Sequence, residues 1–250
     1  PAGVKTVGFD PQLVTYAGIY GHLGPGGWGT LSEYTTGEQA AQAAIAYANQ
    51  IDSINGSRQT IALVNIVARN EQASTIEEVI NACSPMRCIV MIDISPQEDV
   101  ESVINDWGYY ENVWIDIDLE HAGSPTSASQ FNEWASQYFT LRIKNGLITP
   151  GVFAFYDFRS DPWLTPPAQV QWTYPNGYVI PIYDGHCRGE PCKAAKWNAT
   201  TGTLQNYSQA PATGIMEFST RWGCGSVYGD CGFTLKEYYD AYTPLIFMSQ

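Results

Sequence analysis

The sequence predicts an α/β protein whose single domain, residues 1–250, is a (β/α)8 TIM barrel. Short apolar, β-rich segments alternate along the chain with helical patterns, which is typical of βα units around a parallel sheet. Seven clear strands and one poorly marked strand within 250 residues match the size of such a barrel. A doubly wound open sheet is the main alternative, but the glycine fingerprint of a dinucleotide-binding turn is absent.

The predicted strands are apolar, β-rich runs. They cover residues 15–21, 60–67, 88–94, 113–119, 151–156, 178–183 and 214–219. Residues 5–9 predict a further short strand, so that residues 1–12 form an N-terminal extension or an edge strand. Residues 187–211 show no strand pattern, and the seventh βα unit is therefore expected to be short or irregular.

Helices are predicted in five segments. They cover residues 36–51, 74–82, 97–107, 127–144 and 234–242. The first of these helices is rich in Ala, the residue with the highest helix propensity. Thr36 and Thr234 are expected to cap their helices, because a Thr side chain accepts a hydrogen bond from the first helical turn.

The charge balance restricts the partners of this protein. Twelve Lys and Arg residues against 25 Asp and Glu residues give a net charge of −13. Such a charge disfavours binding to nucleic acid and to anionic lipid. No apolar run approaches the roughly 20 residues that a membrane-spanning helix needs. The high hydrophobic fraction of 44% and the low charged fraction of 15% predict a packed globular protein.

The cysteines and sequons predict an extracellular protein. The six cysteines form three local pairs among turn-forming residues. The gaps of four, four and six residues within the pairs favour loop disulfides over zinc ligands. The alternatives are other pairings among six cysteines and free buried thiols. Pro1 in place of a starting Met leads us to expect a processed chain. The pairs are Cys83 with Cys88, Cys187 with Cys192, and Cys224 with Cys231, and the glycosylation sequons begin at Asn55, Asn198 and Asn206.

Three carboxylic acids alternate at the end of the fourth predicted strand. Asp116, Asp118 and Glu120 share one strand face, and Ile115 and Ile117 lie on the other face. In a parallel barrel the apolar face would contact the helices, and the acidic face would point into the barrel. Closely spaced carboxyls raise one another's pKa values, which allows one acid to stay protonated beside an ionised neighbour. A solvated acidic strand and a calcium site are the alternatives.

The motif Asp116-Ile-Asp118-Leu-Glu120 resembles that of family 18 glycoside hydrolases, which are chitinases and endo-β-N-acetylglucosaminidases and include the small hevamine-type enzymes of plants. Other segments resemble strands of that family in the same order along the chain. They are residues 17–31 for the first strand, 62–67 for the second, 88–95 for the third, 182–184 for the sixth and 214–219 for the eighth.

The resemblance implies a retaining cleavage of β-linked N-acetylglucosamine polymers, in which the 2-acetamido group of the substrate is the nucleophile. Glu120 would be the general acid and base, and Asp118 would orient the acetamido group. Asp116 would tune Asp118 through a shared proton or hydrogen bond. Tyr183 would donate to the acetamido oxygen, and Asp184 would bind a sugar hydroxyl or support the acid. Packing in the core and a turn are the alternatives for these two residues.

The sequence also departs from the family pattern. Val113 and Trp114 replace an Asp and a Gly before the acidic motif, and residues 93–96 replace the usual Ser-x-Gly-Gly. Phe218 stands where the family places the Trp that forms the floor of the sugar site. These changes favour a second function class: a catalytically silent relative that binds carbohydrate or assembles on a surface. A lysozyme-like barrel hydrolase that cuts peptidoglycan is a third possibility.

Several residues at strand ends complete the predicted site. Trp28 and Trp222 follow strand ends and are predicted to stack on sugars, although most Trp residues simply pack under loops. Asp157 is predicted to face the same cleft, and Glu217 is either a second acid or the partner of an Arg. The three histidines lack metal-ligand spacing, so no metal and no cofactor is expected. The expected partner is a glycan, with a homo-oligomer or a surface assembly as a further possibility.

Overall fold

The computed structural model describes residues 14–53, 59–95, 97–118, 128–147, 151–156, 173–174, 177–184, 215–218 and 246–249. Strands and helices alternate along most of this part of the chain, which gives an α/β fold. The predicted α/β class is therefore confirmed, and the arrangement of the elements is compatible with a TIM-barrel-like fold.

Parallel pairing dominates the sheet. In order along the sheet, each strand pairs in parallel with the next, β5 pairs with β7, and β9 pairs in turn with β1. A two-residue strand, β6 (Thr173–Tyr174), runs antiparallel to β7. The parallel strands within the described residues are β1 (Val14–Gly21), β2 (Gln59–Val67), β3 (Ile89–Ile94), β4 (Val113–Asp118), β5 (Gly151–Tyr156), β7 (Gly177–Asp184), β8 (Ile215–Phe218) and β9 (Ile246–Ser249).

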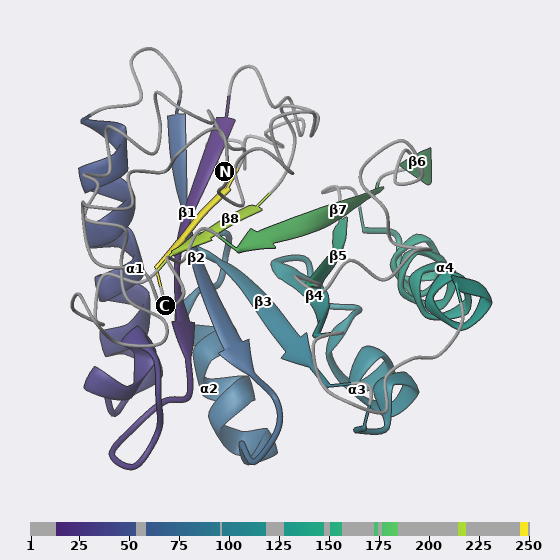
Figure 1. Ribbon diagram of the computed structural model, residues 1–250, viewed down its shortest axis with the longest axis horizontal. Helices are drawn as coiled ribbons and strands as arrows, with labels where there is room; N and C mark the ends of the chain where they lie inside the picture. The colour runs from purple at the N-terminus through teal and green to yellow at the C-terminus, as the bar shows by residue number, and fades with distance from the viewer. Residues whose placement is uncertain are drawn as a thin grey trace, which may run out of the picture.

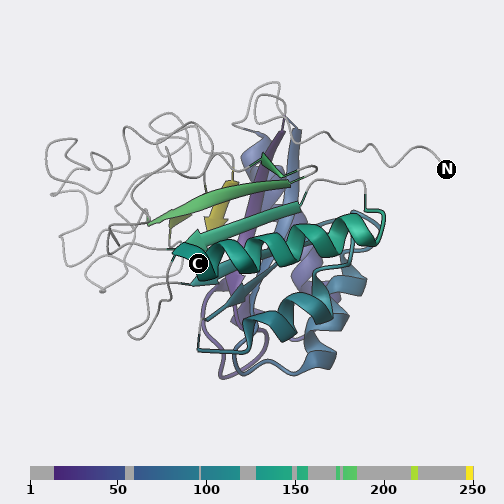
Figure 2. The same ribbon diagram turned by 90° about the vertical axis from the view of Figure 1, so that its right-hand side faces the viewer.

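The helices lie outside the strands (Figure 1), and the view turned by 90° shows α4 alongside β5 (Figure 2). In the described part of the chain, no helix combines the length and the apolarity that crossing a bilayer requires. A short 3-10 helix, η1, precedes the α-helices. The elements are η1 (Thr30–Glu33), α1 (Gly37–Asp52), α2 (Ala73–Ala82), α3 (Val100–Trp107) and α4 (Ala128–Lys144).

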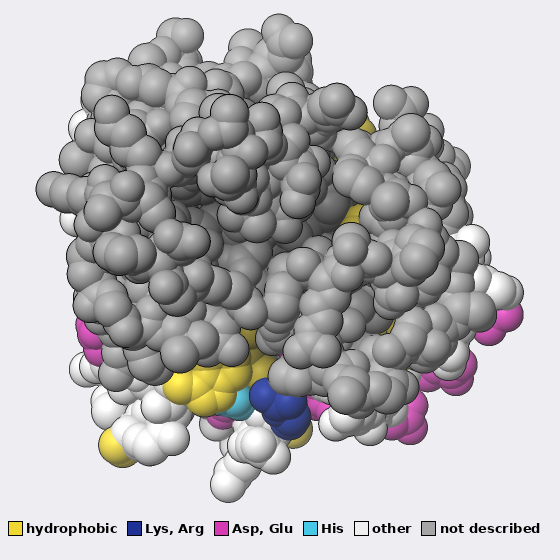
Figure 3. Space-filling view, in the orientation of Figure 1, with side chains coloured by type: hydrophobic (Ala, Val, Ile, Leu, Met, Phe, Trp, Pro, Cys, Tyr) yellow, Lys and Arg dark blue, Asp and Glu magenta, His cyan; other side chains and the backbone are white. Residues whose placement is uncertain are grey.

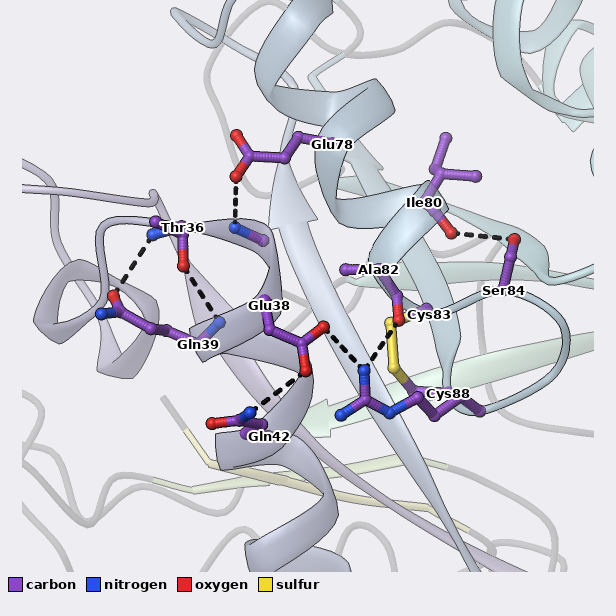
Figure 4. A network of polar contacts seen from close by, with 12 residues as sticks. Thr36, Glu38, Gln39, Gln42, Glu78, Ile80, Ala82, Cys83, Ser84 and Cys88 are labelled. Atoms are coloured by element: carbon purple, nitrogen blue, oxygen red, sulfur yellow. Dashed lines mark hydrogen bonds and ion pairs between the residues drawn. A yellow bond between two sulfur atoms is a disulfide. The ribbon is translucent and has the colours of Figure 1, made fainter.

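Helix α1 begins where the sequence predicts. The Thr36 hydroxyl accepts a hydrogen bond from the Gln39 backbone N–H at 3.1 Å, and the Gln39 side chain accepts from the Thr36 N–H at 3.3 Å (Figure 4). Such a capping box stabilises a helix by about 1 kcal/mol. Helix α3 begins later than predicted, because Asp99 accepts from Ser102 and so provides the cap.

A disulfide closes the loop that follows α2, and polar contacts join α1 to α2 and to this loop (Figure 4). The predicted bond between Cys83 and Cys88 is present. Arg87 pairs with Glu38 at 2.7 Å on the exposed surface, where solvent screens an ion pair strongly. The other predicted disulfide cysteines and the sequons lie outside the described residues: Cys187, Cys192, Cys224, Cys231, Asn55, Asn198 and Asn206.

One strand position in the prediction is wrong. Strand β8 corresponds to the predicted segment 214–219, but the parallel strand β9 follows it at Ile246–Ser249. Strand β8 is therefore the seventh parallel strand in chain order within the described residues, and β9 is the eighth. The predicted strand 5–9 and helix 234–242 lie outside the described residues.

Two hydrophobic clusters lie on the two faces of the sheet. The outer cluster joins the strands to the helices and contains Ile115 and Ile117 of β4 together with Phe139 of α4. The inner cluster lies on the other face of the strands. It consists of Tyr16, Tyr20, Leu63, Val67, Ile89, Met91, Trp114, Val152 and Ala154. Since Trp114 belongs to the inner cluster, strand alternation places Asp116 and Asp118 on the same face as this cluster, opposite the helices.

Candidate active site

Buried polar side chains occupy the inner face near the carboxyl ends of four neighbouring strands. Tyr20 comes from β1, Asn65 from β2, Asp93 from β3, and Asp116 and Asp118 from β4. The relative exposure of each is 6% or less. This burial contradicts the alternative of a solvated acidic strand. Among the described residues, no group of three or more His, Cys, Asp or Glu side chains is arranged to hold a metal ion.

The register of β3 and β4 brings two of these acids together. Asp93 and Asp116 are direct partners across the parallel pair, so their side chains lie next to each other on one face of the sheet, and Asp93 influences the pKa of Asp116. We call Asp93, Asp116 and Asp118 the carboxyl row. In the sequence, Asp93 stands out only as the first residue of the segment 93–96 that departs from the family pattern, because register between strands is set by the folded sheet.

Two polar side chains from neighbouring strands hold the acids of the carboxyl row in place. The Tyr20 hydroxyl donates to Asp93 Oδ2 at 3.1 Å. The Asn65 amide donates to Asp116 Oδ1 at 3.2 Å and to the Met91 carbonyl at 2.9 Å. Asn65 thus ties the side chain of Asp116 to the backbone of β3.

The environment of Asp116 favours its protonated form. Burial, followed by the negative charge of Asp118, raises the pKa of Asp116 to about 7. The hydrogen bonds from Asn65 and Asp93 oppose this rise by stabilising the ionised form. The site therefore contains a carboxyl group that keeps its proton over much of the acidic range, as acid–base chemistry requires.

The loop after β1 places Trp28 at the edge of this site. The Trp28 ring lies 5.2 Å from the Tyr20 ring and 5.1 Å from the His22 ring, both in edge-to-face geometry. Gly21 and Gly29 form an antiparallel bridge that closes the loop. Both have positive φ, and a Cβ on either would collide with the facing backbone, so this loop requires glycine at the two positions.

A second polar contact supports the same loop. His22 Nδ1 lies 3.2 Å from Glu71 Oε1, and the Leu23 N–H donates to the same oxygen at 3.0 Å. Glu71 follows β2, so this contact joins the loops after the first two strands. Trp28 is thus held between Tyr20, which contacts the carboxyl row, and His22, which is anchored to Glu71.

Surface charge and the carboxyl row are separate features. On the face seen in Figure 3, hydrophobic side chains gather beside a His and a basic side chain at the lower edge, and many of the Asp and Glu side chains lie at the right-hand edge. The acids of the carboxyl row are buried beneath the surface. The net charge of −13 therefore gives no indication of where these buried acids lie.

The remaining predicted site residues are only partly described. For Tyr183, Asp184 and Phe218 the structure gives the backbone alone, with Tyr183 paired to Met216 and Asp184 to Glu217. Because β8 is followed by β9, Phe218 does not lie on the last strand, contrary to the expectation. Glu120, Asp157 and Trp222 lie outside the described residues.

Sequence analysis missed Tyr20 and Asn65 as members of the site. A signal for Asn65 exists, because it is the only polar residue in the apolar run from Ile61 to Val67. A polar residue inside a buried strand needs a hydrogen-bond partner, and Asp116 supplies it. Tyr20 carries no comparable signal, because Tyr is common in strands.

Comparison with known proteins gives no family. No protein-family model matches the sequence, and none of the curated proteins matches it. Among solved structures, the chain is similar to the Clostridial cellulose synthase subunit Z (CcsZ) from Clostridioides difficile. That similarity has a TM-score of 0.49 and 11% identity, and it covers 94% of this chain and 91% of the other. The function is therefore argued from the site alone.

Proposed function

We propose that this protein is a glycoside hydrolase of the family 18 type that cleaves β-linked N-acetylglucosamine polymers. The observation that carries the proposal is the carboxyl row, buried on the inner face and ending two residues before Glu120. Glycoside cleavage requires a protonated acid beside an ionised group that stabilises a positive centre. The raised pKa of Asp116 keeps a proton on the neighbour of Asp118, which supports Asp118 as the ionised group, with Glu120 proposed as the acid.

We also propose that the eight parallel strands close into a (β/α)8 barrel. The pairings of β5 with β7 and of β9 with β1 support closure. In such a barrel the carboxyl ends of the strands form the catalytic face. Tyr20, Asn65, Asp93, Asp116 and Asp118 all lie toward those ends of their strands.

In the proposed reaction, Glu120 donates a proton to the glycosidic oxygen while the acetamido oxygen of the substrate attacks C1. The glycosidic bond breaks, the leaving sugar departs with that proton, and an oxazolinium ion forms. Asp118 carries the negative charge that stabilises this cation. Water then attacks C1 and returns a proton to Glu120, so that the configuration at C1 is retained.

Strand β7 offers two further contacts to the sugar, Tyr183 to the acetamido oxygen and Asp184 to a hydroxyl. Tyr178 belongs to the periphery of the inner cluster, and Val179 belongs to the outer cluster. Since alternate positions of a strand share a face, position 184 shares the face of Tyr178.

Trp28 is proposed as a stacking subsite, because an aromatic face suits a sugar ring and its ring leans against Tyr20. Trp222, Phe218 and Asp157 are proposed to contribute to the same cleft. An extracellular location fits a polysaccharide substrate, and the Cys83–Cys88 disulfide supports an oxidising compartment.

The test is hydrolysis of fluorogenic chitobiose and chitotriose substrates from pH 4 to pH 8. Turnover by the native protein should fall at least about 100-fold in Glu120→Gln, because the proton donor is lost. Glu133→Gln, which removes an exposed carboxyl on α4, is the matched control and should keep full activity. Equal turnover in Glu120→Gln and the native protein would refute the assignment.

A catalytically silent relative is the second candidate. The observation in its favour is that Asp93 and Ile94 end β3 and Ser95 follows, where active members of the resembled family have Ser-x-Gly-Gly. This candidate predicts binding to chitin oligomers, or concentration-dependent assembly, with no turnover at any pH. Calorimetric titration with chitotriose and sedimentation at several concentrations distinguish it from the enzyme.

A further inference from the structure

The pairing of Asp93 with Asp116 on neighbouring strands has a chemical consequence that the proposed function leaves unused. A carboxylate can only accept hydrogen bonds, so two ionised carboxylates cannot bond to each other. The register places the buried Asp93 and Asp116 side by side, so one proton on the pair replaces the repulsion of two charges by a hydrogen bond.

Neighbouring groups occupy the two outer sides of this pair. Tyr20 donates to Asp93 Oδ2 at 3.1 Å, and Asn65 donates to Asp116 Oδ1 at 3.2 Å. Both donors stabilise negative charge, one on each acid. Asp118 is the other charged group that faces Asp116, and among the described residues no Lys or Arg contributes to the titration of Asp116. The pair is thus built to hold one negative charge and one proton.

We propose that Asp93 is a positioning residue that shares a single proton with Asp116, so that the pair carries one negative charge and Asp118 keeps its own charge. Without Asp93, the nearest acidic partner of Asp116 would be Asp118, and any shared proton would neutralise Asp118. Only this consequence for Asp118 rests on the proposed hydrolase function; the shared proton itself does not.

The test is a carbon NMR titration of protein labelled with ¹³C at the aspartate carboxyls, which needs no substrate. In the native protein one carboxyl resonance should titrate near neutral pH. In Asp93→Asn the amide donates to Asp116 and one negative charge is lost, so the titration of Asp116 should move down by about one pH unit or more. An unchanged titration of Asp116 would overturn the proposal, since burial alone would then explain it.

Tyr20→Phe should shift the carboxyl titration in the opposite direction. It removes the donor to Asp93 and leaves both carboxyls in place, so the pair should hold its proton more tightly and titrate at higher pH. A titration that is unchanged or moves to lower pH would also overturn the proposal. The titration can be read whether or not the protein hydrolyses chitobiose, so the two proposals can fail separately.

Discussion

The stability of this protein should fall as the pH rises through the acidic range, and Asp116→Asn should remove much of that fall. Burial raises the pKa of Asp116 from 3.8 to about 7 in the folded protein. The folded state therefore binds this proton more tightly than the unfolded state, and its contribution to stability is full below about pH 4 and lost by about pH 7. About three pH units at about 1.4 kcal/mol each give a loss of about 4 kcal/mol.

Urea unfolding between pH 4.5 and pH 8, followed by tryptophan fluorescence, measures this effect. As the pH rises, the free energy of unfolding of Asp116→Asn should increase relative to that of the native protein. Asn keeps the shape of the side chain and its hydrogen-bonding capacity toward Asn65. Glu133→Gln should follow the native curve. If native and Asp116→Asn curves stay parallel across this range, the buried-acid reasoning is wrong.

Two further changes test the stability of the fold away from the carboxyl row. Replacing Cys83 and Cys88 by Ser opens a loop with a sequence separation of 5, which should cost about 2 kcal/mol in urea unfolding; an effect below about 0.5 kcal/mol would contradict this. Gly177→Ala places a Cβ against the ring of Phe139 and should cost about 1–3 kcal/mol from overpacking, seen as a lower Tm; an unchanged Tm would show that Phe139 moves aside freely.

The sequence predicts the elements whose local signals agree with their tertiary roles. Helix α1 begins after Thr36 as expected, because the capping box is a local interaction. Strand β5 matches its predicted range, because glycine and aromatic residues mark both ends. Strand β9 was missed because Ile246–Ser249 has four residues and no alternation, so that pairing with β1 and β8 defines it as a strand.

The candidate site was likewise predictable from the sequence only in part. Alternation along β4 correctly predicts that Asp116 and Asp118 lie opposite Ile115 and Ile117. The partnership of Asp93 with Asp116 was not predictable, because it depends on the register between two strands 23 residues apart. Local pattern thus identifies which side chains face inward, and only the folded sheet determines which of them meet.

The apolar layer beneath the carboxyl row connects packing to acid chemistry. Met91 precedes Asp93 by two residues, and Trp114 precedes Asp116 by two, so each acid stands directly above a member of the inner cluster. This layer limits hydration of the acids from below, and desolvation is the largest cause of the raised pKa of Asp116. The same burial that stabilises the sheet therefore raises the proton affinity of the carboxyl row. A change in the inner cluster that admits water should weaken both the fold and the acid, because the two depend on one packed layer.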